Sequence, residues 1–290
     1  MFGQIAEITS KSSDVPRAGQ SYSSDAFKMV LDMINIFNGI TPAMWQKQKR
    51  RGKARQQTAE LENDADGSAT LRLLEKVKDV ATLVSDNGTH NPGSIGLDQA
   101  VYSYGVTGKF HTGAFIASLR FAKELEAQNK LKNFTKVRAD FEEFLVKHKV
   151  FINQLAHSKG SRTRPVEAML QMHRIILECL ESGTRTARKI VRKLKAHEQL
   201  KDLKDVTNIP STENRRKRFS KEAEQAKVVL TILETRERCP ECGARLPPSC
   251  RSKDHRTRSA DGGKGTLANL AYTHAYCNTG KKIPDATKTA

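Results

Sequence analysis

The sequence lacks the features of a membrane-bound or secreted protein. It has no apolar run near the roughly 18 to 20 residues that a membrane-spanning helix requires. Its first residues contain no basic segment followed by an apolar one, as a secretory signal would. Cysteine is scarce, with five in 290 residues, and four of them lie between positions 239 and 277. These absences predict a cytoplasmic chain with no membrane partner and no disulfide framework.

Acidic residues are too few to balance the basic ones, and the imbalance is uneven along the chain. Residues 1–100 hold 12 basic and 12 acidic side chains, residues 101–200 hold 19 and 9, and residues 201–290 hold 19 and 11. The net charge of +18 therefore lies in the last two thirds. A basic surface suits a phosphate backbone, because each neutralised phosphate releases counterions. A merely solvated basic face is the alternative interpretation of the charge alone.

Helical periodicity dominates the first two thirds of the chain. Apolar residues recur at helical spacing in segments that are separated by turn-forming residues. The pattern predicts helices over residues 24–37, 41–55, 71–83, 112–129, 135–155, 166–180, 185–203 and 213–237. The expected fold class is mainly α, with a multi-helix N-terminal domain followed by a small α+β module.

Composition divides the chain into five parts. Residues 1–24 are rich in Ser, Gly, Asp and Pro and predict a flexible arm. Residues 25–205 are expected to form the basic helical domain, and residues 206–237 a linker with a connecting helix. The linker is placed where Pro210 interrupts the periodicity. Residues 238–284 are expected to form the small module, and residues 285–290 a tail.

The small module contains two pairs of soft metal ligands. Cys239 and Cys242 form a C-x2-C pair, and His274 and Cys277 form an H-x2-C pair after 31 intervening residues. Three sulfurs and one imidazole nitrogen at this spacing predict a tetrahedral structural zinc site. Cys250 is an alternative fourth ligand, which would leave His274 available to an active site. A module of roughly 45 residues with few large apolar side chains needs such a metal to hold a core.

Further polar residues lie between and beside the two pairs, and their order carries a resemblance. They are Asp254, His255, Asn269 and Asn278, with Gly262-Gly263 in the middle and Lys281-Lys282 at the end. This series resembles the HNH endonucleases, whose pattern runs C-x2-C, Asp-His, Gly-Gly, Asn-Leu, C-x2-C and His or Asn, then Lys. The chain departs from it in having His274 where the family usually has cysteine. The resemblance implies a ββα-metal fold around one catalytic Mg²⁺ or Mn²⁺.

The resemblance also implies a role for each residue. His255 is the implied general base that takes a proton from the attacking water, a role that suits an imidazole pKa near ~6.5. Asp254 and Asn278 are the implied oxygen ligands of Mg²⁺ or Mn²⁺. The amide oxygen of Asn269 is implied to hold the His255 ring in the productive tautomer. The cations expected to meet substrate phosphates are Arg256, Arg258, Lys264, Lys281 and Lys282.

Together these roles predict a metal-dependent DNA endonuclease or nickase. Two alternatives stay open: a non-catalytic zinc-stapled module that only grips nucleic acid, and a nuclease subunit that acts only within a larger defence complex. Residues 100–115 and 137–149 resemble the C-terminal part of GmrSD-like restriction proteins, which implies a role in phage defence. The ParB-like N-terminal domain of those proteins is missing, so the chain is expected to be the back half of such a protein or a separate subunit.

Overall fold

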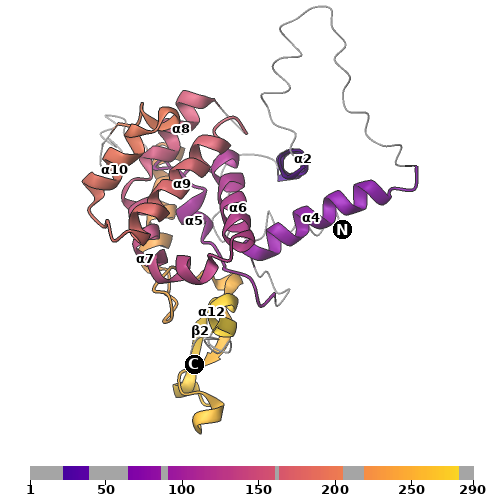
Figure 1. Ribbon diagram of the computed structural model, residues 1–290, viewed down its shortest axis with the longest axis vertical. Coiled ribbons are helices and arrows are strands. Elements are labelled where there is room, and N and C mark those ends of the chain that lie inside the picture. The colour runs from indigo at the N-terminus through magenta and orange to yellow at the C-terminus, as the bar shows by residue number, and fades with distance from the viewer. Residues whose placement is uncertain (1–21, 39–64, 86–90, 161–162, 205–218, 281–290) are drawn as a thin grey trace, which may run out of the picture.

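The computed structural model describes residues 22–38, 65–85, 91–160, 163–204 and 219–280. Within these ranges the chain is mainly helical, with a small two-stranded sheet towards the C-terminal end. Figure 1 shows most of the helices gathered in one body, from which the yellow strands and the last helix extend. The predicted class, mainly α with a small α+β part, is confirmed at this level. Most of the predicted arm, the helix over 41–55, the linker and the tail lie outside the described residues.

Helices α6 (Thr112–Ala127) and α9 (Val166–Glu181) form the centre of the core. Many of the inner residues of α6 are small, so neighbouring helices approach it closely and bury it on most sides. The buried stripe of α9 contains Cys179, the one cysteine that lies outside positions 239–277. Helix α7 (Leu131–Lys147) packs against both of them. The predicted helices over 112–129 and 166–180 are therefore confirmed.

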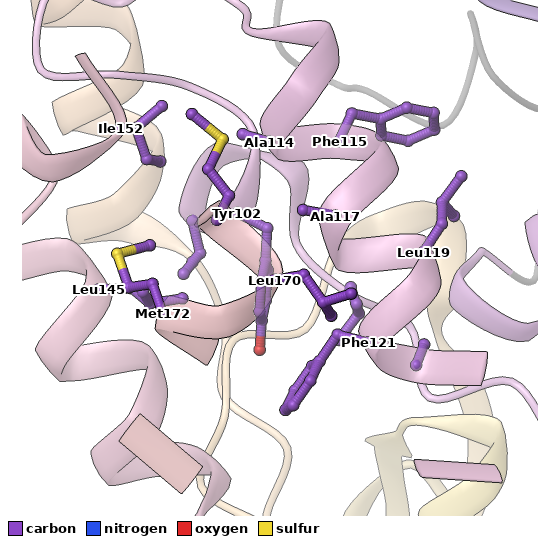
Figure 2. Packing of buried hydrophobic residues seen from close by; sticks show 14 of the residues in the cluster. Tyr102, Ala114, Phe115, Ala117, Leu119, Phe121, Leu145, Ile152, Leu170 and Met172 are labelled. Atoms are coloured by element: carbon purple, nitrogen blue, oxygen red, sulfur yellow. The ribbon is translucent and has the colours of Figure 1, made fainter. Parts of the chain in front are cut away.

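A cluster of aromatic rings fills the space between these three helices. Phe121 stacks on Phe141 with ring centroids 5.4 Å apart, and Tyr102 stacks on the same Phe141 ring at 6.3 Å. Figure 2 shows Tyr102 and Phe121 among the buried side chains. His173 belongs to the same cluster, because its ring centroid is 5.3 Å from that of Phe121 and 5.8 Å from that of Phe141. Complete burial lowers the pKa of His173 to about 3, so the ring is neutral in the folded protein.

Two helices on the N-terminal side extend the core. Helix α2 (Tyr22–Phe37) packs on α4 (Ser68–Val84), and α4 in turn packs on α6. The buried residues of α4 recur at helical spacing, as the sequence predicts for 71–83. No helix in the described ranges has both the length and the apolar character needed to cross a membrane.

The segment predicted as one helix over 135–155 is in fact two helices. Helix α7 ends at Lys147, and α8 (Val150–Lys159) begins after a break at His148 and Lys149. The ammonium of Lys149 is buried and donates three hydrogen bonds to the end of α5 (Gln99–Tyr102) and the turn after it. These bonds satisfy all three donors and hold the chain at the break. The acceptors are the carbonyl oxygens of Ala100, Val101 and Tyr104, at 2.5, 3.1 and 2.7 Å.

The basic segment predicted as a helix over 185–203 is also shorter than expected. Helix α10 (Ala187–Ala196) gives way to a short 3-10 turn, η1 (Glu198–Leu200). Leu200 and Leu203 then return to the core, where both are buried. These two leucines belong to the apolar pattern of the segment, which explains why periodicity alone extended the helix to them.

The connecting helix is part of the helical body. Helix α11 (Lys221–Thr235) is capped at its N-terminus by Ser220, whose hydroxyl accepts a hydrogen bond from the Ala223 N–H at 3.2 Å. Val229 and Leu233 are buried in the core, and the helix packs on α5. Its predicted start near residue 213 lies outside the described residues.

The small module follows α11. Strands β1 (Ser252–His255) and β2 (Leu270–Thr273) pair in antiparallel register, and α12 (Ala275–Gly280) packs on β1. Ser252 lies opposite Thr273, and His255 lies opposite Leu270. The two strands and the helix agree with the small α+β module that the sequence predicts over 238–284.

Candidate functional site

The four predicted zinc ligands come together in one cluster. One ligand atom each from Cys239, Cys242, His274 and Cys277 lies within 4.8 Å of the others. His274 Nδ1 is 3.4 Å from the Cys242 sulfur and 3.9 Å from the Cys277 sulfur. A set of three thiols and one imidazole nitrogen fits a tetrahedral metal such as zinc. The cluster is therefore able to hold a metal, and it contains the four residues that the sequence predicts.

Local backbone structure positions both ligand pairs. After Cys239 the chain reverses in a tight turn, in which the Gly243 N–H donates to the Cys239 carbonyl at 2.8 Å. Gly243 has a φ of 68°, a left-handed conformation that glycine adopts without strain. His274 and Cys277 are three residues apart at the start of α12, so their side chains share one face of a helical turn.

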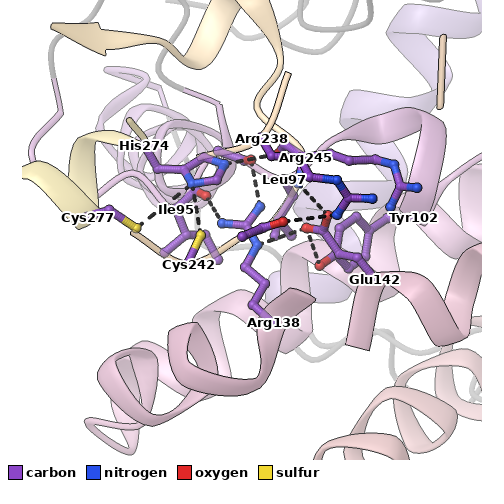
Figure 3. Close-up of polar contacts among 12 residues, drawn as sticks. Ile95, Leu97, Tyr102, Arg138, Glu142, Arg238, Cys242, Arg245, His274 and Cys277 are labelled. Carbon is purple, nitrogen blue, oxygen red and sulfur yellow. Dashed lines mark hydrogen bonds and ion pairs between the residues drawn. The ribbon is translucent and has the colours of Figure 1, made fainter. Parts of the chain in front are cut away.

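The surroundings of His274 favour its role as a ligand. Burial lowers the pKa of His274, which keeps the imidazole neutral, as metal binding requires. The Nε2 atom lies 3.1 Å from the carbonyl oxygen of Arg245 and donates to it, so Nδ1 is the nitrogen that faces the thiols (Figure 3). Such a second hydrogen bond fixes both the tautomer and the ring orientation of a ligating histidine.

Cys250 does not replace His274 in the cluster. Its side chain is buried beside Gly96, in the loop before α5, and lies outside the group of four ligand atoms. A β-carbon on Gly96 would come within 2.8 Å of Cys250 Cβ and 2.9 Å of His274 Cδ2. Only glycine fits between the cluster and the helical body at this point. The alternative in which Cys250 is the fourth ligand is therefore wrong.

Asp254 and Asn278 lie on the same face of β1. Asn278, on α12, donates through Nδ2 to the Ser252 hydroxyl at 3.0 Å and to the Lys253 carbonyl at 2.9 Å. Ser252 and Asp254 share a strand face because side chains alternate. With Nδ2 directed at β1, the Oδ1 atom of Asn278 accepts no hydrogen bond from the described residues. A half-buried carboxylate and a free amide oxygen are donors that suit a hard cation such as Mg²⁺ or Mn²⁺.

His255 is exposed at the end of β1. Its own N–H donates to Asp254 Oδ1 at 2.8 Å, but the ring makes no hydrogen bond or ion pair within the described ranges. The structure therefore places His255 next to Asp254 in the chain without joining its ring to Asp254, Asn269 or Asn278. An exposed ring without a partner is accessible to water.

The expected contact between Asn269 and the His255 ring is not present. The Asn269 amide instead bridges the loop after β1: Oδ1 accepts from the Thr257 N–H at 2.7 Å. Its Nδ2 donates to the carbonyls of Thr257 at 3.0 Å and Lys264 at 2.8 Å. Both Nδ2 hydrogens are thereby used, and Oδ1 is directed at the Thr257 N–H and makes no hydrogen bond with the His255 ring. Asn269 thus fixes the backbone that follows His255, and its predicted action on the ring tautomer is wrong.

The loop between the two strands carries exposed cations. Arg256, Arg258 and Lys264 are all exposed, whereas the expected contributors Lys281 and Lys282 lie outside the described residues. The loop is tightly folded at Gly263, where a β-carbon would meet the Thr257 carbonyl oxygen at 1.8 Å. Leu267, three residues before β2 begins, is 90% exposed. The loop therefore offers three exposed cations and one exposed apolar side chain to solvent.

A buried polar network joins the module to the helical body, and the sequence analysis missed it. Arg138 and Glu142 on α7 pair at 2.9 Å with both side chains fully buried. Glu142 also accepts from the Tyr102 hydroxyl at 3.2 Å and from the Arg245 N–H at 2.9 Å. Arg138 in turn donates to the carbonyls of Ile95 and Gly96 (Figure 3). The available signal was the position of Arg138 and Glu142 on the apolar face of α7, beside Phe134, Phe141 and Leu145.

Three ion pairs, formed with two carboxylates, lie beside this network. Arg236, just after α11, pairs with the buried Asp98 at 2.8 Å. Arg238 pairs with Glu143 on α7 at 2.6 Å, and Arg245 reaches the same carboxylate at 3.1 Å. These arginines hold the pKa of Glu143 low against the effect of its partial burial. Hydrogen bonds and ion pairs therefore connect the segment that carries the four-ligand cluster to α7 and to the residues before α5.

No family model, no curated protein and no solved structure matches this chain. Function is therefore inferred from the residues and their geometry. The candidate site combines the four-ligand cluster, Asp254 and Asn278 on one face of β1, and the exposed His255 next to Asp254.

Proposed function

We propose that the chain is a metal-dependent endonuclease or nickase of the HNH type that hydrolyses DNA phosphodiester bonds. The observation that carries the proposal is the strand-strand-helix unit in which Asn278 is bonded to β1 on the face that bears Asp254. The cluster of Cys239, Cys242, His274 and Cys277 supports the unit and is proposed to hold a structural zinc.

Each residue of the unit has a proposed chemical role. His255 takes a proton from the water that attacks phosphorus, which an exposed imidazole without a partner is able to do. Asp254 and the Oδ1 atom of Asn278 hold the catalytic cation. A bound Mg²⁺ or Mn²⁺ would stabilise the negative charge that develops on the phosphate and the departing oxygen. Asn269 acts indirectly, because it fixes the loop that carries Arg256 and Arg258 next to the scissile phosphate.

The test is cleavage of supercoiled plasmid by the purified chain with Mg²⁺ or Mn²⁺. His255→Ala should lower the rate by about 10² to 10⁴, the usual effect of losing a general base. Its zinc content and melting temperature should not change, since the ring is exposed and has no partner in the described chain. His157→Ala, which removes another exposed histidine on α8, is the matched control. Activity of His255→Ala within a few-fold of the parent would eliminate His255 as the base.

A non-catalytic nucleic-acid-binding module is the second candidate, supported by the exposed Arg256, Arg258 and Lys264. It predicts duplex binding that survives EDTA and no conversion to open-circle or linear plasmid with either metal. The nuclease is further proposed to serve in phage defence or restriction, alone or with a partner subunit. A partner-dependent enzyme would bind plasmid alone and cleave it only after the partner is added.

A further inference from the structure

Helix α10 presents an entirely basic surface. Its three buried residues, Ile190, Val191 and Leu194, anchor one side in the core. The helix has no acidic residue, and every cation on it is exposed. These cations are Arg188, Lys189, Arg192, Lys193 and Lys195. In Figure 1 the helix lies at the left edge of the helical body, while the strands of the module extend below it.

The charges of α10 are not neutralised by the rest of the described chain. Several arginines elsewhere on the body have carboxylate partners: Arg174 pairs with Glu124 at 2.5 Å, and Arg185, just before α10, pairs with Asp140 at 2.7 Å. No cation of α10 forms an ion pair with any residue of the described ranges. Helix α10 therefore carries a concentrated positive charge that no ion pair of the described residues balances.

This arrangement is unfavourable for the helix itself. Like charges four residues apart, as in Arg188 and Arg192 or Lys189 and Lys193, destabilise a helix by about a few tenths of a kcal/mol per pair. Two cations in the first turn also oppose the helix dipole, whereas Lys193 and Lys195 in the last turn favour it. The buried apolar stripe keeps α10 folded despite both effects. Like charges that are held side by side at such a cost are typical of a surface that binds something.

The burial and charge of α10 favour a ligand that is bound through its phosphates rather than by insertion of the helix into a lipid surface. A helix that inserts into a lipid surface needs its apolar face available, and that of α10 is buried in the core. Contact must therefore be made by charge alone. Ten residues of helix extend about 15 Å, a length of duplex axis along which one strand carries roughly four phosphates, at about 3.4 Å of axis each.

We propose that α10 is a phosphate-backbone binding site for duplex nucleic acid, separate from the zinc-stapled module. The inference rests on the proposed function for the identity of the ligand, but not on the cleavage chemistry. In this arrangement the helical body holds the duplex through its phosphates, without reading sequence, while the module acts on one phosphate.

The test is binding of a fluorescent random-sequence duplex at several salt concentrations. In the α10 variant, Arg188, Lys189, Arg192 and Lys193 are replaced by Gln, which keeps helix propensity nearly constant. The slope of log K against log salt should become shallower by about three to four, at about 0.9 per lost phosphate contact. The control replaces four other exposed cations, Arg72, Lys76, Lys123 and Lys130, by Gln, so that both variants lose the same net charge. The control should keep the parent slope.

The proposal would be overturned if the parent and the α10 variant had equal salt slopes. It would also be overturned if the slopes of the α10 variant and the control variant became shallower by the same amount. Loss of binding to vesicles of anionic lipid with unchanged duplex binding would also overturn it, in favour of a membrane surface. If the α10 variant does not fold, Arg192→Gln with Lys193→Gln should give about half the change in slope. His255→Ala should keep the parent slope, and single-turnover cleavage by the α10 variant at saturating protein should keep the parent rate. A failure of the nuclease proposal is thereby distinguished from a failure of this one.

Discussion

Replacing Glu142 by Ala should destabilise the protein more than most single changes in this chain. Its carboxylate is fully buried and is the shared acceptor for the Arg138 guanidinium, the Tyr102 hydroxyl and the Arg245 N–H. Removing it leaves a buried guanidinium whose remaining hydrogen-bond acceptors are the carbonyls of Ile95 and Gly96. A guanidinium stays charged at any accessible pH, so the molecule cannot relieve the penalty by losing a proton.

Breaking a buried ion pair in this way costs about 3 to 5 kcal/mol. For a chain of this size the corresponding fall in melting temperature is about 6 to 10 °C, at roughly 2 °C per kcal/mol. The free energy of unfolding is measured by urea denaturation followed by circular dichroism. Replacing both partners, as in Arg138→Met with Glu142→Leu, should restore most of the lost stability, because no unpaired charge is then buried.

Asp140→Ala is the matched control for this prediction. Asp140 lies on the same helix and also pairs with an arginine, but its side chain is 48% exposed and that of Arg185 is 62% exposed. Exposed pairs contribute about 0 to 1 kcal/mol, so the control should unfold almost like the parent. If Glu142→Ala is as mild as Asp140→Ala, the buried network does not fasten the module to α7 as described.

Two further changes test the metal cluster and the aromatic core. Cys239→Ser should lose the bound zinc, because a hydroxyl is a poor substitute for a thiolate ligand. The module should then become sensitive to protease while the helical body stays folded. Normal zinc content in this variant would contradict the ligand assignment. His173→Leu should make stability less dependent on acid. Burial lowers the pKa of His173 to about 3 in the folded protein, below the unfolded value near 6.5. Between these two pH values the unfolded chain therefore binds one more proton than the folded protein. The free energy of unfolding of the parent falls as pH falls from about 6.5 towards 3. Between pH 6.5 and pH 5 this loss is about 1.6 kcal/mol, because the slope rises from half of about 1.4 kcal/mol per pH unit to nearly the full value. Urea titrations of parent and variant at the two pH values measure it. An equal loss in both proteins would show that His173 is not the group responsible.

The parts of the fold that local sequence determines were predictable. Helices α6 and α9 carry long apolar stripes at helical spacing, and both were placed within a few residues. The two strands lie between turn signals and metal ligands, which limit where they begin and end. The four-ligand cluster was predictable for a similar reason, since ligand type and spacing along the chain are sufficient to suggest it.

The features that depend on distant partners were not predictable. The break at His148 is held by Lys149, whose acceptors lie 45 to 49 residues earlier in the chain. The Glu142 carboxylate meets the Arg245 N–H across 103 residues. Asn269 shows a different limit, because its residue type permits several hydrogen-bond partners. The conformation of the loop decides that these partners are Thr257 and Lys264.

The fit of Gly96 against Cys250 and His274 bears on how such a module changes in evolution. A strand-strand-helix unit with its own set of metal ligands looks like a module that could be transferred between unrelated proteins. Here the loop before α5, which belongs to the helical body, packs directly against the module. Any larger residue at position 96 would collide with Cys250 and His274. Exchange of residues 238–284 alone should therefore fail, whereas a graft that also transfers residues 94–98 and α7 should succeed. Among relatives, position 96 should vary only together with positions 250 and 274.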